Sequence, residues 1–94
     1  MAEVMQQWFW EEIELAAGRK VALWMRARED LVPLGVDVLE LREGQEDRRV
    51  TGVRAHALQT FVRAGERVDV VLRCSASLEP CTVLVQLRWR RRRS

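Results

Sequence analysis

Few side chains of this sequence could act as nucleophiles or proton-transfer groups, and their spacing favours no catalytic site. His56 is the only histidine and lies in an alternating stretch, residues 50–57, which is typical of a structural or exposed position. Ser75 and Ser77 belong to a loop-like segment, where serine is common because its hydroxyl bonds to the local backbone. A nucleophile needs a neighbouring base, and the pattern suggests none. We therefore expect no enzyme and no small-molecule substrate.

The cysteines and the acidic cluster are the candidates for a metal site or a disulfide. Cys74 and Cys81 flank the segment SASLEP, so they could face each other across a hairpin and form a disulfide. Zinc would need two further nitrogen or sulfur ligands, and only His56 remains. The acids of residues 40–47 do not match the spacing of a calcium-binding loop. We expect two reduced thiols, leave the disulfide open, and expect no cofactor or metal.

Basic charge is concentrated at the C-terminal end of the sequence. The chain has 16 basic and 14 acidic residues, and without the five arginines of the tail, residues 88–94, the body has 11 basic residues against the same 14 acids. Nucleic-acid-binding domains usually carry positive charge across a face, whereas this body is mildly acidic. Nucleic-acid binding by the tail is therefore the alternative function. The residues that would make this contact are Trp89, Arg90, Arg91, Arg92 and Arg93.

Exposed aromatic residues favour a protein interface. Trp8, Phe9 and Trp10 are consecutive, so they cannot all face one core, and Trp24 lies opposite the apolar positions of its own strand. Large apolar side chains left at the surface are typical anchors of interfaces. Stacking of sugars on these rings ranks third, because the chain has no Asn and no Tyr. The expected interface residues are Trp8, Phe9, Trp10 and Trp24, with Glu43, Glu46 and Asp47 as the acidic complement of the arginine tail.

The elements that must position these residues come from an internal repeat. Residues 17–26 (AGRKVALWMR) resemble residues 64–73 (AGERVDVVLR), and an offset of 47 residues gives eight identities in the 22 positions from residue 17 to residue 38. Two copies of one unit, residues 1–47 and 48–94, are more typical of a closed pseudo-twofold domain than of a solenoid. We expect one domain spanning residues 1–94.

The repeat unit has the pattern of short strands. Apolar residues alternate in residues 20–28 and 67–75, and a glycine turn precedes each stretch. A second strand is expected after each proline, and a third in residues 12–16 and 59–63. Residues 2–11 fit a helix or a strand. We therefore predict an all-β fold with six to eight short, mainly antiparallel strands in a pseudo-twofold sandwich or small barrel.

The remaining patterns bound the location and the function of the protein. The longest uncharged runs, residues 55–62 and 80–87, have eight residues each, fewer than the roughly 18 needed to span a membrane. An acid at Glu3 and no basic residue before Arg19 is not the order of a signal peptide. We expect a cytoplasmic or virion protein without a membrane partner. The favoured function is a non-enzymatic module that self-associates or docks into a larger protein assembly, for example as a small virion or capsid-decorating subunit.

Overall fold

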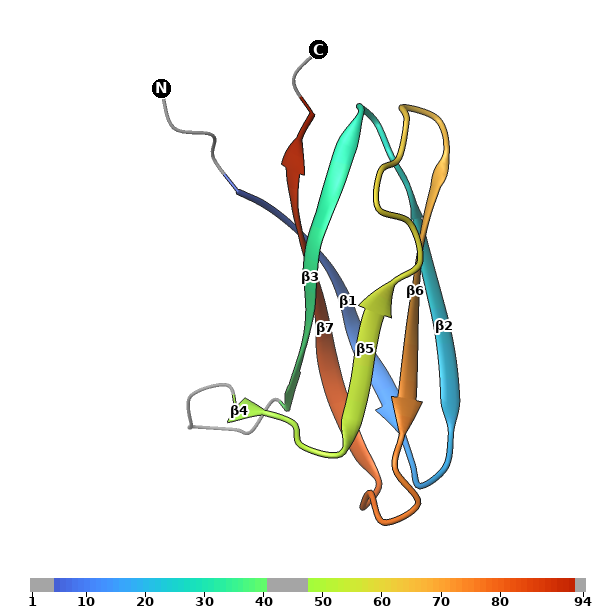
Figure 1. The fold of residues 1–94 in the computed structure, drawn as a ribbon. Coiled ribbons are helices and arrows are strands. Elements are labelled where there is room, and N and C mark those ends of the chain that lie inside the picture. The colour runs from blue at the N-terminus through green and yellow to red at the C-terminus, as the bar shows by residue number, and fades with distance from the viewer. Residues whose placement is uncertain (1–4, 41–47, 93–94) are drawn as a thin grey trace.

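The computed structural model describes residues 5–40 and 48–92, with only the backbone of Arg48. These residues form antiparallel strands and no helix (Figure 1). The strands are Gln6–Leu15 (β1), Lys20–Arg26 (β2), Leu31–Glu40 (β3), Arg48–Arg49 (β4), Val53–Ala57 (β5), Arg67–Cys74 (β6) and Cys81–Arg91 (β7). The predicted all-β class and the predicted number of strands are confirmed.

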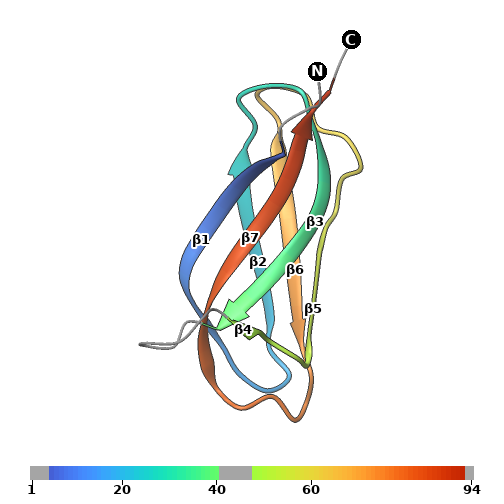
Figure 2. The same ribbon diagram turned by 90° about the vertical axis from the view of Figure 1, so that its left-hand side faces the viewer.

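Two sheets pack face to face as a sandwich. One sheet has four strands in the order β1-β7-β3-β4, and the other has three in the order β2-β6-β5. Figure 2 shows the first sheet in front of the second. The chain passes between the sheets at the β1–β2, β2–β3, β4–β5 and β6–β7 connections, so these neighbours in sequence lie in different sheets and do not pair. Gly18 has a φ of 69° in the first of these connections, a conformation that glycine adopts without steric cost.

Alternating apolar side chains build the core between the sheets. Val68, Val70 and Leu72 of β6 are fully buried, and Val83, Val85 and Leu87 of β7 are buried opposite them. Successive side chains of a strand point to opposite faces, so the residues between these positions face outward. On β6 the outward residues are Arg67, Asp69, Val71 and Arg73, and of these Val71 is buried, at 8% exposure. This alternation determines which side chains are available for function.

The repeat appears in the register of the central strands. In the β2–β6 pair Leu23 lies opposite Val70, and in the β3–β7 pair Val38 lies opposite Val85. Both pairs join residues that are 47 positions apart, so equivalent residues of the two copies meet at the centre of each pair, as a twofold between the copies requires.

The outer strands break this symmetry. β1 pairs with β7, whereas the equivalent stretch of the second copy starts as β5 beside β6. It reaches β3 only at a single bridge between Leu31 and Val62. The expected strand at residues 59–63 is therefore wrong, because this stretch connects β5 to β6 of the same sheet and adds only that one bridge to the other sheet. The break leaves β1 as an edge strand of the larger sheet.

The first strand settles the helix alternative for residues 2–11. β1 is extended from Gln6, so the helical interpretation is wrong for the part of that segment that the structure describes. The register shifts between Trp10 and Ile13, which marks a β-bulge, and Glu12 takes a φ of 53° there. A bulge adds one residue to a strand and bends it. Trp10 and Ile13 are therefore three residues apart on the same face of β1, a spacing that resembles that of a helix.

Candidate functional site

Of the three consecutive aromatic residues of β1, Trp8 and Trp10 face the inner side of the sheet and Phe9 faces the outer side. Trp8 lies opposite Leu87 on the inner side of the sheet, while Phe9 lies opposite Gln86 on the outer side. They are 39% and 44% exposed, respectively. Trp10 is half-buried, and its indole Nε1 donates a hydrogen bond of 3.2 Å to the backbone carbonyl of Trp24 on β2. Trp8 and Phe9 thus offer apolar surface, whereas Trp10 connects the two sheets through this hydrogen bond.

The outer edge of β1 is open along its first half. β1 is the terminal strand of its sheet, so among the described residues no strand pairs with its other side. Residues 6–10 (QQWFW), which we call the aromatic edge, carry no charge and keep a regular register with β7. The bulge ends this regularity, and exposed Glu11 and Glu12 follow it. Charges and bulges normally protect edge strands from pairing with other chains, and here they protect only the second half.

Trp24 belongs to a different surface from the aromatic edge. It is 52% exposed on the outer face of the three-stranded sheet. The Arg67 guanidinium lies 5.0 Å from the centre of its ring, and the same Arg67 forms an ion pair of 2.7 Å with Asp69. Hydrogen bonds from Arg67 and then from Gln59 hold the pKa of the Asp69 carboxyl below its ordinary value, since both stabilise the charged form. The four expected aromatic anchors therefore do not form one patch.

Three cations cross the outer face of the same sheet. Lys20 of β2 lies opposite Arg73 of β6, and Arg73 lies opposite Arg54 of β5. We call these three residues the basic row; all are exposed, and none forms an ion pair with an acid among the residues that the structure describes. Sequence reasoning missed this row because it joins positions far apart in the chain. Alternation alone placed each cation outward, but the strand order was needed to bring them together.

The arginine tail is largely engaged with the body of the protein. β7 extends to Arg91, whose guanidinium pairs with Glu29 at 2.7 Å, and the guanidinium of Arg92 lies 4.2 Å from the ring centre of Phe61. Trp89 is half-buried against the core, and its buried indole nitrogen has no hydrogen-bond partner among the described residues. Arg90 belongs to β7 as well. Trp89 therefore closes the core and does not present its ring as an open stacking platform.

The first arginine of the tail, Arg88, forms an ion pair with Asp37. Arg88 donates from Nε to Asp37 at 2.7 Å, and Arg49 donates to the other oxygen of that carboxylate at 3.1 Å. The predicted acidic complement of the tail consists of Glu43, Glu46 and Asp47. These residues, and Arg93 of the tail, lie outside the described residues. Their pairing with the tail stays a prediction.

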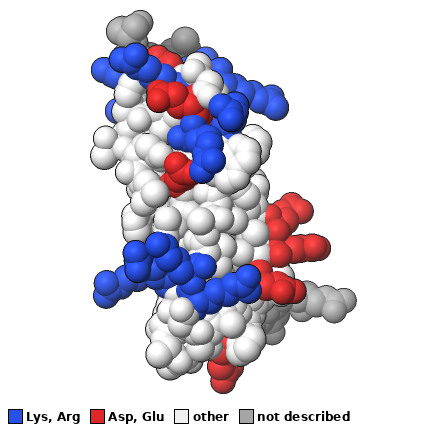
Figure 3. Space-filling model, turned by 90° about the vertical axis from the view of Figure 1, so that its right-hand side faces the viewer, with Lys and Arg blue, Asp and Glu red and all other residues white. Residues whose placement is uncertain are grey.

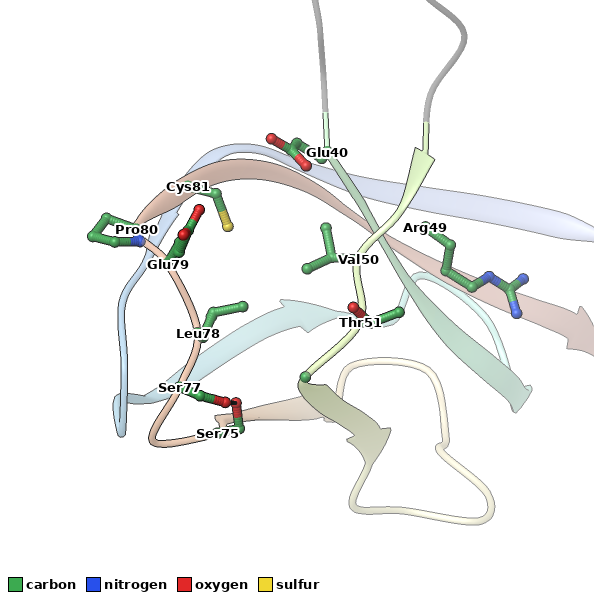
Figure 4. Close-up of a pocket in the computed structure, with 11 residues that line it drawn as sticks. Glu40, Arg49, Val50, Thr51, Ser75, Ser77, Leu78, Glu79, Pro80 and Cys81 are labelled. Atoms are coloured by element: carbon green, nitrogen blue, oxygen red, sulfur yellow. Dashed lines mark hydrogen bonds between the residues drawn. The ribbon is translucent and has the colours of Figure 1, made fainter.

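An open depression of about 660 Å³ lies at one end of the sandwich, between the residue 50–52 connection and the β6–β7 loop (Figure 4). The side chains of Cys81 and Leu78 point into it, and Glu40 lies at its rim. Burial, followed by the charge of Glu40 and by Cys74, raises the pKa of the Cys81 thiol above its ordinary value. The thiol therefore stays protonated and is a weak nucleophile near neutral pH.

The two cysteines lie in different sheets. Cys74 ends β6 and Cys81 begins β7, so the expected hairpin between paired strands is wrong. Both are free thiols, as the favoured prediction has it. His56 lies on the outer face opposite Val71 and does not line the depression. Among residues 5–40 and 48–92, no three His, Cys, Asp or Glu side chains are grouped to hold a metal ion.

Comparisons with known proteins do not assign the chain to a class. No protein-family model matches the sequence, and neither the curated proteins nor the solved structures contain a significant match to it. In the part of the chain that the structure describes, no helix is long and apolar enough to cross a membrane. The functional argument therefore depends on the surfaces described above.

Proposed function

We propose that the protein is a non-enzymatic interaction module that self-associates through the aromatic edge of β1. The observation that carries this proposal is the uncharged, regular first half of an edge strand, with two exposed aromatic side chains and no described strand on its open side. The backbone groups on that side are available to a further strand. A second copy of the chain supplies a strand with the same open side.

A twofold axis beside residues 6–10 would join two copies. The two β1 strands would then run antiparallel and continue the four-stranded sheet from one molecule into the next. Such an interface is isologous, since the same residues contribute from both sides. Phe9 would cover the joint on the outer face and Trp8 on the inner face, because they point to opposite sides of the strand. Aromatic pairs across neighbouring strands stabilise a sheet further.

The bulge would limit the contact to the first half of the strand. Glu11 and Glu12 follow the aromatic edge, and the φ of 53° at Glu12 accompanies a local bend. The expected pairing therefore involves about five residues from each copy and favours a discrete joint over a continuous stack. We further propose that this joint builds the chain into a larger protein assembly, such as a virion.

Catalysis and nucleic-acid binding by the tail are less well supported than self-association. The raised pKa of Cys81 argues against a thiolate nucleophile in the depression. Arg91 and Arg92 contact Glu29 and Phe61, so binding of phosphates by the tail would first have to break these contacts.

Sedimentation or light scattering over a concentration series tests the proposal. The wild-type protein is expected to form dimers, and Phe9→Lys is expected to shift it to monomers, because a charge at the joint opposes edge pairing. Leu58→Lys is the matched control: Leu58 is also an exposed apolar residue, at 56%, but lies away from β1. A wild-type monomer at high concentration, or an equal effect of the two substitutions, would contradict the proposal.

A further inference from the structure

The outer face of the three-stranded sheet is strongly positive. The outward-facing residues of β2, β5 and β6 include five cations, Lys20, Arg26, Arg54, Arg67 and Arg73, and one acid, Asp69. The whole chain has a net charge of only +2. Figure 3 shows this face, with a band of basic side chains across the lower part and an uncharged belt above it. Positive charge is therefore spread over a face of the body as well as the tail.

The basic row lacks an internal counter-charge. Arg73 lies between Lys20 and Arg54, and like charges directly opposite each other destabilise a sheet. The acid of this face, Asp69, is already bound by Arg67 and by the side-chain amide of Gln59 at 2.8 Å. A fold that tolerates this unfavourable arrangement offers a ready site for an anion supplied from outside.

An uncharged belt lies beside the basic row. Two residues further along each strand, Ala22, Val71 and His56 lie opposite one another, about 7 Å from the row, since a strand rises about 3.4 Å per residue. Trp24 lies two residues beyond Ala22 on β2, opposite Asp69, and remains 52% exposed although Arg67 lies over one face of its ring. Flat side chains thus lie next to cations on an open sheet.

We propose that this face binds single-stranded nucleic acid. The basic row would hold the phosphate backbone, and unpaired bases would lie on the belt, where Trp24 and His56 provide stacking surfaces. This combination of cations along the backbone and aromatic rings under the bases is the general chemistry of single-strand binding. A sheet surface can bind splayed bases in this way, whereas reading a duplex requires an element that enters a groove. An acidic peptide would use the cations but gain nothing specific from stacking on Trp24.

This proposal does not depend on self-association. The basic row belongs to the three-stranded sheet, whereas the aromatic edge belongs to the four-stranded sheet. The two surfaces can therefore be tested separately, and binding is expected to persist in the Phe9→Lys variant.

Fluorescence anisotropy with a labelled oligo(dT) of about 16 nucleotides tests the proposal, because this length covers the upper range of single-strand site sizes. Neutralising three phosphates predicts a slope of about −2 for log affinity against log salt, which is a loss of about 20-fold between about 50 and 200 mM salt. In Arg54→Gln/Arg73→Gln only one cation of the row remains, so the slope is expected to fall to about −0.7.

The matched control is Arg63→Gln/Arg92→Gln. It removes the same charge from two exposed arginines outside the three-stranded sheet, one of them in the tail. This variant is expected to bind as the wild type does. A loss of affinity equal to that of the double variant in the basic row would overturn the proposal, since binding would then reflect overall charge or the tail.

Trp24→Ala tests the stacking contribution without changing charge. We expect a loss of affinity of about tenfold with an unchanged salt slope, in keeping with the usual effect of removing one stacked ring. Unchanged affinity in this variant would overturn the role of the belt. Absence of binding by the wild-type protein at about 50 mM salt, equal or tighter binding of a duplex of the same length, or displacement by poly-glutamate as effective as by unlabelled oligo(dT) would overturn the proposal itself.

Discussion

Replacing Arg73 by Glu should make the protein more stable, although it introduces a charge reversal. Arg73 is the middle residue of the basic row and lies opposite Lys20 on one side and Arg54 on the other. The substitution turns two repulsive cross-strand pairs into two attractive ones. Arg73 is exposed and makes no ion pair among the described residues, so the substitution breaks none there.

The size of the effect follows from the two pairs. A cross-strand charge pair contributes roughly 0.2–1 kcal/mol, and exposed pairs lie at the lower end of that range. Two pairs that change from repulsion to attraction should raise the free energy of unfolding by about 1 kcal/mol. For a domain of this length, the melting temperature should then rise by about 4–8 °C.

Thermal unfolding followed by circular dichroism measures this change. Arg63→Glu is the control, because it makes the same change of charge in a connection outside the strands. The stabilisation by Arg73→Glu should decrease at about 1 M salt, where exposed charges are screened over about 3 Å. A melting temperature equal to or below that of the control, or a gain that salt does not reduce, would refute the reasoning.

Three further predictions concern the core, pH and the thiols. Leu72→Ala should lower the free energy of unfolding by about 2–5 kcal/mol, because Leu72 is fully buried, whereas exposed Leu58→Ala should change it by less than about 0.5 kcal/mol; urea denaturation measures both. The pKa of the Asp69 carboxyl is lower in the folded state than its unfolded value of 3.8. The charged carboxylate therefore stabilises the fold above pH 3.8, and this stabilisation is lost as pH falls through the lower folded pKa. The difference in unfolding free energy between wild type and Asp69→Asn should shrink in acid. In a Cys74→Ser background, Cys81 should react with iodoacetamide at pH 8 more slowly than glutathione does, because its pKa is raised; equal rates would contradict this.

The sequence allows the central strands to be predicted but not their partners. Val68, Val70 and Leu72 recur at every second position, and three of the four alternate residues, Arg67, Asp69 and Arg73, are charged, so β6 is recognisable from local pattern alone. The position of β5 is not, because the repeat places a strand at residues 59–63 by analogy with residues 12–16, whereas residues 53–57 pair with β6. The same limit explains the cysteines: proximity in sequence suggested a hairpin, whereas the chain passes from one sheet to the other between them.

The candidate surfaces show the same division. Exposure of Trp24 follows from its place in an alternating strand, and exposure of Trp8 and Phe9 follows from a run of three aromatic residues that one face cannot accommodate. The open edge of β1 and the basic row depend on strand order, which is a non-local property. The likeness of the two copies hides this order, since β1 and its equivalent β5 join different sheets.

The pairing between the two copies has a consequence for biosynthesis. In the described part of the chain, β1, β2 and β3 pair with no strand of their own copy; β1 and β3 flank β7, and β2 pairs with β6. When the ribosome has made only the first half, that half has no sheet to form. β2 must wait for β6, and β1 and β3 must wait until β7, the last described strand, is inserted between them. The nascent chain therefore exposes aggregation-prone segments until β7 has been synthesised, so folding of this domain is expected to be slow.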